Sequence, residues 1–184
     1  MEVNRTSVRV SLEAFSDASD GEALKSRDLA RMLLACSPEP FSRAQFTPGH
    51  ITATGLVVGP DGLSVLLVHH RRLDRWLLPG GHVEPEDATI ADAARREVIE
   101  ETGAVLAPEP PPRLIGVDVH GIPAKGAEPY HLHHDLLFSF RALTTDLQVS
   151  KESRAVLWCI PAAFDRYSLP DNIRRAYARF RSTE

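Results

Sequence analysis

The sequence predicts a mixed α+β domain that is preceded by an N-terminal helical extension. Three observations support this fold class. From His50 onward the chain contains several short runs of β-branched and aliphatic residues, a composition typical of strands. One amphipathic helix, residues 90–102, lies among these runs, and residues 1–48 instead carry helical spacing. We therefore divide the chain into a helical extension, residues 1–48, and a main domain, residues 49–184.

The extension contains one recognisable helix, in the segment DGEALKSRDLARMLLACS. This segment begins with a polar Asp-Gly pair and ends before a proline. Four apolar residues fall near helical spacing and predict its buried side: Leu24, Leu29, Met32 and Leu33. The sequence leaves open whether this helix packs on the main domain or on a partner chain.

The strands of the main domain follow in order. The runs ITATGLVV and SVLLVHH flank GPDG, a strong turn signal, and predict a hairpin. RWLLPGG predicts a short strand that ends at glycines, and further strands are expected in RLIGVDVHGI, YHLHHDLLFSFRAL and AVLWCI. AAFDRY and DNIRRAYARFRS predict closing helices, the second with three residues directed inward: Ile173, Tyr177 and Phe180.

The helix over residues 90–102 is the best-defined element. Ile90, Ala94 and Val98 form an apolar row at i, i+4 and i+8, and Gly103 supplies the expected C-terminal stop. The sequence therefore predicts a helix with one buried face between two strands.

Composition narrows the classes of function. Twenty-one Lys and Arg against 25 Asp and Glu give a formal charge of −4, so no bulk basic field favours nucleic-acid binding. The sequence has neither the apolar core of a signal peptide nor a segment that could span a bilayer, and we expect a cytoplasmic location with no membrane partner. Cys36 and Cys159 form no CxxC pair, and Cys159 is expected to be a buried, inert thiol.

Three glutamates, Glu97, Glu100 and Glu101, lie at helical spacing of i, i+3 and i+4 and share one face. Their mutual repulsion destabilises an exposed helix by a few tenths of a kcal/mol per pair, about 0.2–0.5. Oxygen-only clusters suit hard cations such as Mg²⁺. Arg96 is positioned to orient a carboxylate by a two-pronged hydrogen bond. The alternative interpretation is an ordinary solvated acidic face.

The surrounding residues favour the chemical interpretation. The segment GGHVEPED…RREVIEETGA resembles the Nudix box, G-x5-E-x7-R-E-U-x-E-E-x-G-U, where U is an aliphatic residue. The matching positions are Gly81, Arg96, Glu97, Val98, Glu100, Glu101, Gly103 and Ala104. Two departures exist: Asp87 occupies the position of the first glutamate, and eight residues rather than seven separate it from Arg96.

The resemblance implies a Nudix-type α/β/α sandwich with a mixed sheet over the main domain. It implies a metal-dependent hydrolase that cleaves the diphosphate linkage of a nucleoside diphosphate joined to another moiety, with Mg²⁺ or Mn²⁺ and an activated water. Metal ligands would then be Glu97, Glu100 and Glu101, and the catalytic set would contain Glu97, Glu100, Arg96 and Glu152. Glu152 stands in a later loop, where many family members place a metal ligand or general base, although an exposed loop glutamate is equally expected. Glu84 and Asp87 are weaker candidates for supporting the metal.

Substrate-binding candidates surround this segment. Gly81 belongs to a side-chain-free turn that can approach a phosphate closely, and Arg71 and Arg75 lie close to that turn in sequence. Period-two alternation puts His131, His133 and Asp135 on one face of their strand, with His134 on the apolar face. H-x-H-x-D is compatible with a borderline metal site, but we favour phosphate contacts or a supporting network, and a purely structural polar face is equally expected. His82 and His120 are weaker candidates, and Trp76 is expected in the core.

Two other function classes are open. Some Nudix-like domains are ligand sensors without turnover, and isopentenyl-diphosphate isomerase shares the fold but needs a catalytic cysteine, which is lacking near a plausible pocket. The expected partner is a small nucleotide-type substrate: a nucleotide sugar, an ADP-ribose-like compound or a nucleoside triphosphate. A homodimer is compatible with the sequence.

Overall fold

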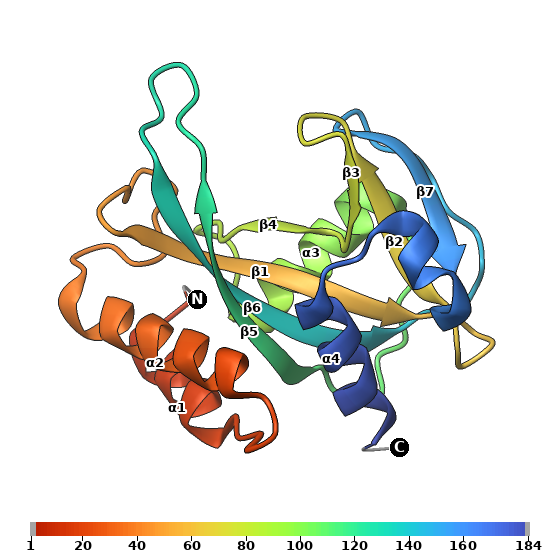
Figure 1. Cartoon of the computed structure of the whole chain (residues 1–184), viewed down its shortest axis with the longest axis horizontal. Coiled ribbons are helices and arrows are strands. Elements are labelled where there is room, and N and C mark those ends of the chain that lie inside the picture. Colours follow the sequence, from red (N-terminus) through yellow and green to blue (C-terminus); the bar gives the residue numbers. More distant parts are fainter. Residues whose placement is uncertain (1–2, 183–184) are drawn as a thin grey trace.

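The central element of the computed structural model, which describes residues 3–182, is a mixed seven-stranded sheet (Figure 1). The strands run in the order β3-β2-β1-β6-β5, with β4 paired to β1 and β7 paired to β2. Their bounds are β1 Gly49–Val58, β2 Val65–His70, β3 Arg75–Leu77, β4 Gly80–His82, β5 Arg113–Ile122, β6 His131–Arg141 and β7 Ser153–Cys159.

Strand β1 is the axis of the sheet. It runs parallel to β6 along its whole length, with His50 opposite His133. Its other edge is shared, because β4 pairs antiparallel with the first half and β2 pairs antiparallel with the end, where Val58 faces Val65. The predicted hairpin between the first two strands is therefore confirmed. The short glycine strand β4 and the long strand β6 lie on opposite edges of β1.

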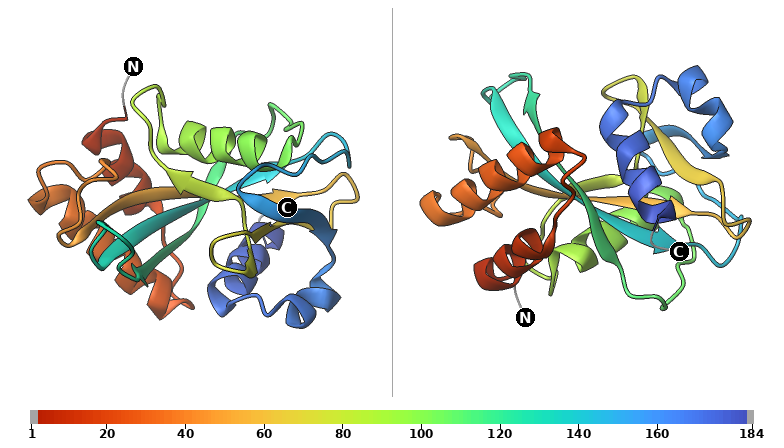
Figure 2. Two further views of the ribbon diagram at one scale, coloured as in Figure 1. Left: turned by 90° about the horizontal axis from the view of Figure 1, so that it is seen from above. Right: turned by 60° about the horizontal axis from the view of Figure 1, so that its bottom comes forward.

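Helices cover both faces of the sheet, as Figure 2 shows with α3 on one side and α4 on the other. Side chains alternate between the two faces of β1. On one face, Ile51 and Ala53 join a buried cluster with helix α3, Ile90–Thr102. On the other face, Leu56 joins a second buried cluster with helix α4, Asp171–Arg181. A 3₁₀ helix, η1 (Pro161–Tyr167), precedes α4. The predicted α/β/α arrangement is confirmed, and the three residues expected to face inward from α4 are buried: Ile173, Tyr177 and Phe180.

Helix α3 has the bounds that the sequence predicts. Ile90, Ala94 and Val98 are buried. The Thr89 hydroxyl accepts the N–H of Asp92 at the N-terminus, and Gly103 ends the helix in the left-handed region with φ 63° and donates its N–H to the Ile99 carbonyl. The acidic face of the helix is thereby held at a fixed place over the sheet.

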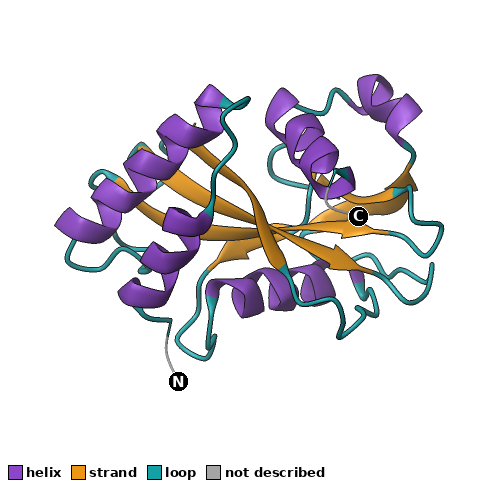
Figure 3. Cartoon of the chain, turned by 90° about the horizontal axis from the view of Figure 1, so that it is seen from below, coloured by secondary structure: helices purple, strands orange, loops and turns teal. Residues whose placement is uncertain are grey.

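Two helices, α1 (Arg5–Ala14) and α2 (Gly21–Cys36), form the extension and lie together at one end of the sheet (Figure 3). Leu12 and Leu33 join the core cluster that contains Ile51, so the extension packs on the main domain. The sequence interpretation missed α1, because its V-x-V spacing among Ser, Thr and Arg does not give a clear helical period. It was right on Leu33, which is buried, and wrong on Leu29 and Met32, which are exposed because α2 buries Ala30 and Leu34 in their place.

Buried charge ties the extension to α4. Asp20 caps α2 by accepting the Ala23 N–H at 3.1 Å. The same carboxylate pairs with Arg175 at 2.8 Å and with Arg179. Asp17 also pairs with Arg179, at 2.6 Å, and the Ser19 hydroxyl and this guanidinium lower the pKa of Asp17 to about 2. The start of α2 and the loop before it are therefore joined to α4 by ion pairs.

None of the helices within residues 3–182 is both long enough and apolar enough to cross a membrane.

Candidate active site

The carboxylate cluster, Glu97, Glu100 and Glu101, faces the glycine strand β4. The Gly80 N–H donates to Glu101 Oε2 at 3.1 Å, and Glu101 is only 6% exposed. A Cβ on Gly81 would stand 2.7 Å from Glu97 Cδ, so a side chain there would require the Glu97 carboxylate to move. Glycine at this position lets that carboxylate pack directly against the backbone.

Arg96 orients this cluster from its centre. Its Nη1 donates to Glu97 Oε1 at 2.9 Å and to Glu100 Oε2 at 3.2 Å, while Nη2 donates to the carbonyl of His82 at 2.8 Å. Nε and Nη2 grip Asp87 in a two-pronged pair at 3.1 and 3.0 Å. The neighbouring carboxylates raise the pKa of Arg96 still further, so it stays charged.

Asp87, at the position of the first glutamate of the box pattern, is held by hydrogen bonds within the protein. It is 5% exposed and accepts the Glu84 N–H at 2.8 Å with the same Oδ2 that meets Arg96. Asp87 therefore holds the loop and Arg96 together, and its carboxylate is already occupied by hydrogen bonds within the protein.

Burial makes the ionised forms of two glutamates in the cluster, Glu97 and Glu101, less favourable. Burial, together with the negative charges of Glu97, Glu152 and Glu100, raises the pKa of Glu101 to about 7, against the Gly80 hydrogen bond. Burial also raises the pKa of Glu97, and the hydrogen bond from Arg96 opposes that shift. Glu100 is the exposed member, with 60% of its side chain accessible. The three carboxylates outnumber the one arginine, and carboxylate oxygens are the ligands that a hard divalent cation prefers.

Glu152 approaches the cluster from the loop before β7. Its charge contributes to the raised pKa values of Glu97 and Glu101, after burial, which dominates both. Arg71 fixes this loop: its Nε donates to the Lys151 carbonyl at 3.1 Å and its Nη2 to the Ser153 carbonyl at 3.2 Å. The Arg71 N–H also donates to the Glu152 carbonyl at 2.9 Å. Sequence positions more than fifty apart thus converge on one set of carboxylates.

Arg75 begins β3 opposite His70 and is exposed. Trp76, the next residue, is half-buried and stacks on His69 at 4.9 Å between ring centroids.

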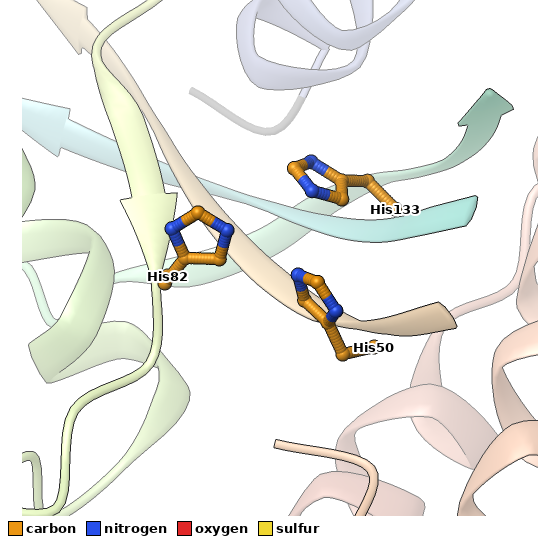
Figure 4. Close-up of side chains that lie close together, drawn as sticks. All are labelled: His50, His82 and His133. Carbon is orange, nitrogen blue, oxygen red and sulfur yellow. The ribbon is translucent and has the colours of Figure 1, made fainter. Parts of the chain in front are cut away.

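The predicted histidines gather in a different place from the carboxylates. His133 lies with His50 and His82 (Figure 4), in a group that we name the histidine cluster. His131 is buried beside it, with Nδ1 2.9 Å from the Pro129 carbonyl and its ring edge-on to Phe46. Sequence reasoning missed His50 and ranked His82 low, because the cluster depends on strand register. Asp135 does not complete the H-x-H-x-D set, since it accepts hydrogen bonds from Thr52 and Thr54 at 3.0 and 2.8 Å.

Comparison with known proteins was made on the whole chain. A family model described as NUDIX domain matches residues 48–180. A search of curated proteins gave no match.

Solved structures share the fold. The NUDIX hydrolase from Nitrosomonas europaea superposes with a TM-score of 0.53 at 20% identity, covering 72% of this chain and 88% of that one. A NUDIX-family hydrolase from Clostridium perfringens gives 0.52 at 19% identity, covering 73% and 98%. The NUDIX domain of Shewanella oneidensis NrtR, complexed with ADP ribose, gives 0.52 at 20% identity and covers 83% and 96%.

Proposed function

Because this chain belongs to the NUDIX domain family and is a Nudix-type pyrophosphohydrolase, we propose that it cleaves the diphosphate linkage of a nucleoside diphosphate joined to another moiety, with Mg²⁺ or Mn²⁺. One observation carries the proposal. Glu97 and Glu101 are buried against the glycine strand β4, where burial and the charge of Glu152 raise the pKa of both carboxyls, so an added positive charge would favour their ionised forms.

The carboxylate cluster, Glu97, Glu100 and Glu101, would hold the cation. A divalent ion there would neutralise the diphosphate and make a bound water acidic. The donor set fits such an ion, because it contains only carboxylate oxygens and Mg²⁺ prefers oxygen ligands. Glu100, which is mostly exposed, is the member that can turn toward solvent or substrate.

Protein groups around the cluster position it. Arg96 acts through Glu97 and Glu100, so it is a positioning residue in the catalytic set. Glu152 is the candidate general base, because it is a carboxylate close enough to affect Glu97 and Glu101 and it is not tied up by Arg96. Gly81 provides the space in which Glu97 and a phosphate group can approach the backbone.

Four further residues are candidates for contact with the substrate or for support of those contacts. Arg75 is exposed and is the candidate phosphate contact. Arg71 donates to two carbonyls of the Glu152 loop, so we assign it to positioning that loop. His133 is half-buried and retains a candidate role beside the substrate, whereas His131 is buried under Phe46 and would support it. The cytoplasmic location and the homodimer stay predictions.

The substrate class is tested with a panel of ADP-ribose, nucleotide sugars and nucleoside triphosphates. ADP-ribose is included because it is complexed with the NUDIX domain of NrtR. Each compound is incubated with Mg²⁺, with Mn²⁺ and with chelator, and products are separated by anion exchange. We expect metal-dependent turnover of at least one compound, with release of a nucleoside monophosphate or of pyrophosphate. Tight binding across the panel without turnover would contradict the proposal and favour a ligand sensor.

A further inference from the structure

The histidine cluster, His50, His82 and His133, combines three imidazoles from three adjacent strands. His50 of β1 lies directly opposite His133 of β6, and His82 of β4 pairs with Thr52, which shares the face of His50. The ring centroids are 4.8 Å apart for His50 and His133, 5.1 Å for His50 and His82, and 5.3 Å for His82 and His133. One ring nitrogen from each residue lies within 4.8 Å of the other two, as the facing rings in Figure 4 illustrate.

The hydrogen bonding of His50 leaves the lone pair of its Nε2 free to bind a metal ion. Its Nδ1 is 3.1 Å from the Gln45 carbonyl, a partner that can only accept, so Nδ1 carries the proton. Nε2 then holds the lone pair, and within residues 3–182 this buried atom has no hydrogen-bond partner. A metal-binding histidine characteristically has this pattern, with one ring nitrogen anchored to a carbonyl and the other on the ion.

The chemistry of the three donors indicates which class of metal the group would take. Imidazole nitrogen suits zinc and other borderline transition metals, whereas Mg²⁺ prefers oxygen.

We propose that His50, His82 and His133 form a second metal site that binds a borderline divalent transition metal of the Zn²⁺ class through three imidazole nitrogens. Three protein ligands leave a fourth position for water or a ligand atom. The site is separate from the carboxylate cluster but connected to it through β4. His82 follows Gly81, and its carbonyl accepts the Nη2 of Arg96.

The proposal is tested by metal binding, which is independent of hydrolysis. Tag-free, chelator-stripped protein with Cys36→Ser, which removes the exposed thiol, is titrated with Zn²⁺ against a chromophoric chelator. We expect one Zn²⁺ per chain with a Kd of about micromolar or tighter, weaker than four-ligand structural sites. Excess Mg²⁺ should not displace it. Co²⁺ should give the intense visible absorption of a four-coordinate site.

Variants locate the ion. His82→Gln and His133→Gln should each weaken Zn²⁺ binding at least about tenfold, comparable to or larger than the loss of a supporting residue. His69→Gln removes a histidine outside the cluster and should change nothing, and Glu97→Gln with Glu101→Gln should keep the Zn²⁺. Zinc binding that is lost in the glutamate variant and kept in the histidine variants would overturn the proposal, as would no binding below millimolar Zn²⁺.

A readout on the unchanged sequence covers the case in which a histidine variant fails to fold. Nitrogen NMR of the imidazoles should show Zn²⁺ shifting one ring nitrogen each of His50, His82 and His133, with the Nδ1 of His50 still protonated. Shifts confined to other histidines would contradict the site. If the panel of nucleotide compounds shows no turnover, these binding results still decide the second proposal.

Discussion

The carboxylate cluster and the histidine cluster lie on opposite faces of one three-residue strand. The Cα of Gly81 faces the carboxylate of Glu97, whereas the ring of His82, the next residue, lies on the other face with the rings of His50 and His133. One face gathers oxygen donors whose charge is unfavourable without a cation, and the other gathers neutral nitrogen donors. The comparison teaches that period-two alternation along a single strand keeps oxygen donors and nitrogen donors on separate faces.

The largest expected effect is on the carboxylate face. Glu97→Gln should lower kcat about a thousandfold, in the range of losing a metal ligand or general base, because it removes the charge beside Gly81. Steady-state hydrolysis of the best panel compound measures this. Far-UV circular dichroism serves as the control for folding. Retention of more than a tenth of the activity would remove Glu97 from the catalytic set.

Gly81→Ala tests the division made by β4. The new Cβ would stand 2.7 Å from Glu97 Cδ and must push the carboxylate aside, so we expect kcat to fall about a hundredfold, as for a shift of about 1 Å at a reacting centre. Gly21→Ala is the matched control, since nothing lies within 4 Å of its Cβ. An unchanged kcat would mean that Glu97 can move without consequence.

Asp87→Asn should have a smaller effect on catalysis and a clear one on stability. It breaks a buried pair with Arg96, and we expect a loss of about 1–3 kcal/mol in the free energy of unfolding and a loss of about tenfold in kcat. Urea unfolding and steady-state kinetics measure the two. Asp92→Asn, on the exposed first turn of α3, is the control. A variant as stable as the original chain would show that Arg96 is held by its other partners.

The smallest effect concerns the charge of Glu101. Its pKa is raised from 4.5 to about 7 in the folded chain, so the folded state binds more protons than the unfolded state between these values. Stability of the chelator-treated chain should therefore fall as pH rises from about 4.5 through 7. Glu101→Gln should flatten this dependence and raise stability at pH 8 by about 1–2 kcal/mol, while removing activity. Thermal melts at pH 5 and pH 8 measure the difference, and parallel curves would contradict the assigned burial cost.

The two clusters also differ in how far the sequence predicted them. Helix α3 and its glutamates lie within a few turns of each other, so spacing alone predicted Glu97, Glu100 and Glu101 on one face. The histidine cluster joins residues 50, 82 and 133, whose meeting depends on the register of β1 with β4 and β6, and sequence spacing carries no register between distant strands. Of the three histidines, the H-x-H-x-D pattern contains only His133. Its aspartate, Asp135, accepts hydrogen bonds from Thr52 and Thr54 and does not join the cluster. In the extension, Met32 was assigned to the wrong side because helical period fixes a face but not its partner.

The grip of Arg96 on Asp87 has a consequence for recognising distant members of the family. An aspartate stands where the box pattern has glutamate, one extra residue precedes Arg96, and the two side chains form a two-pronged pair. A search pattern that asks for any acid in the loop within reach of an arginine on the following helix, and that leaves the loop length variable, would include this chain.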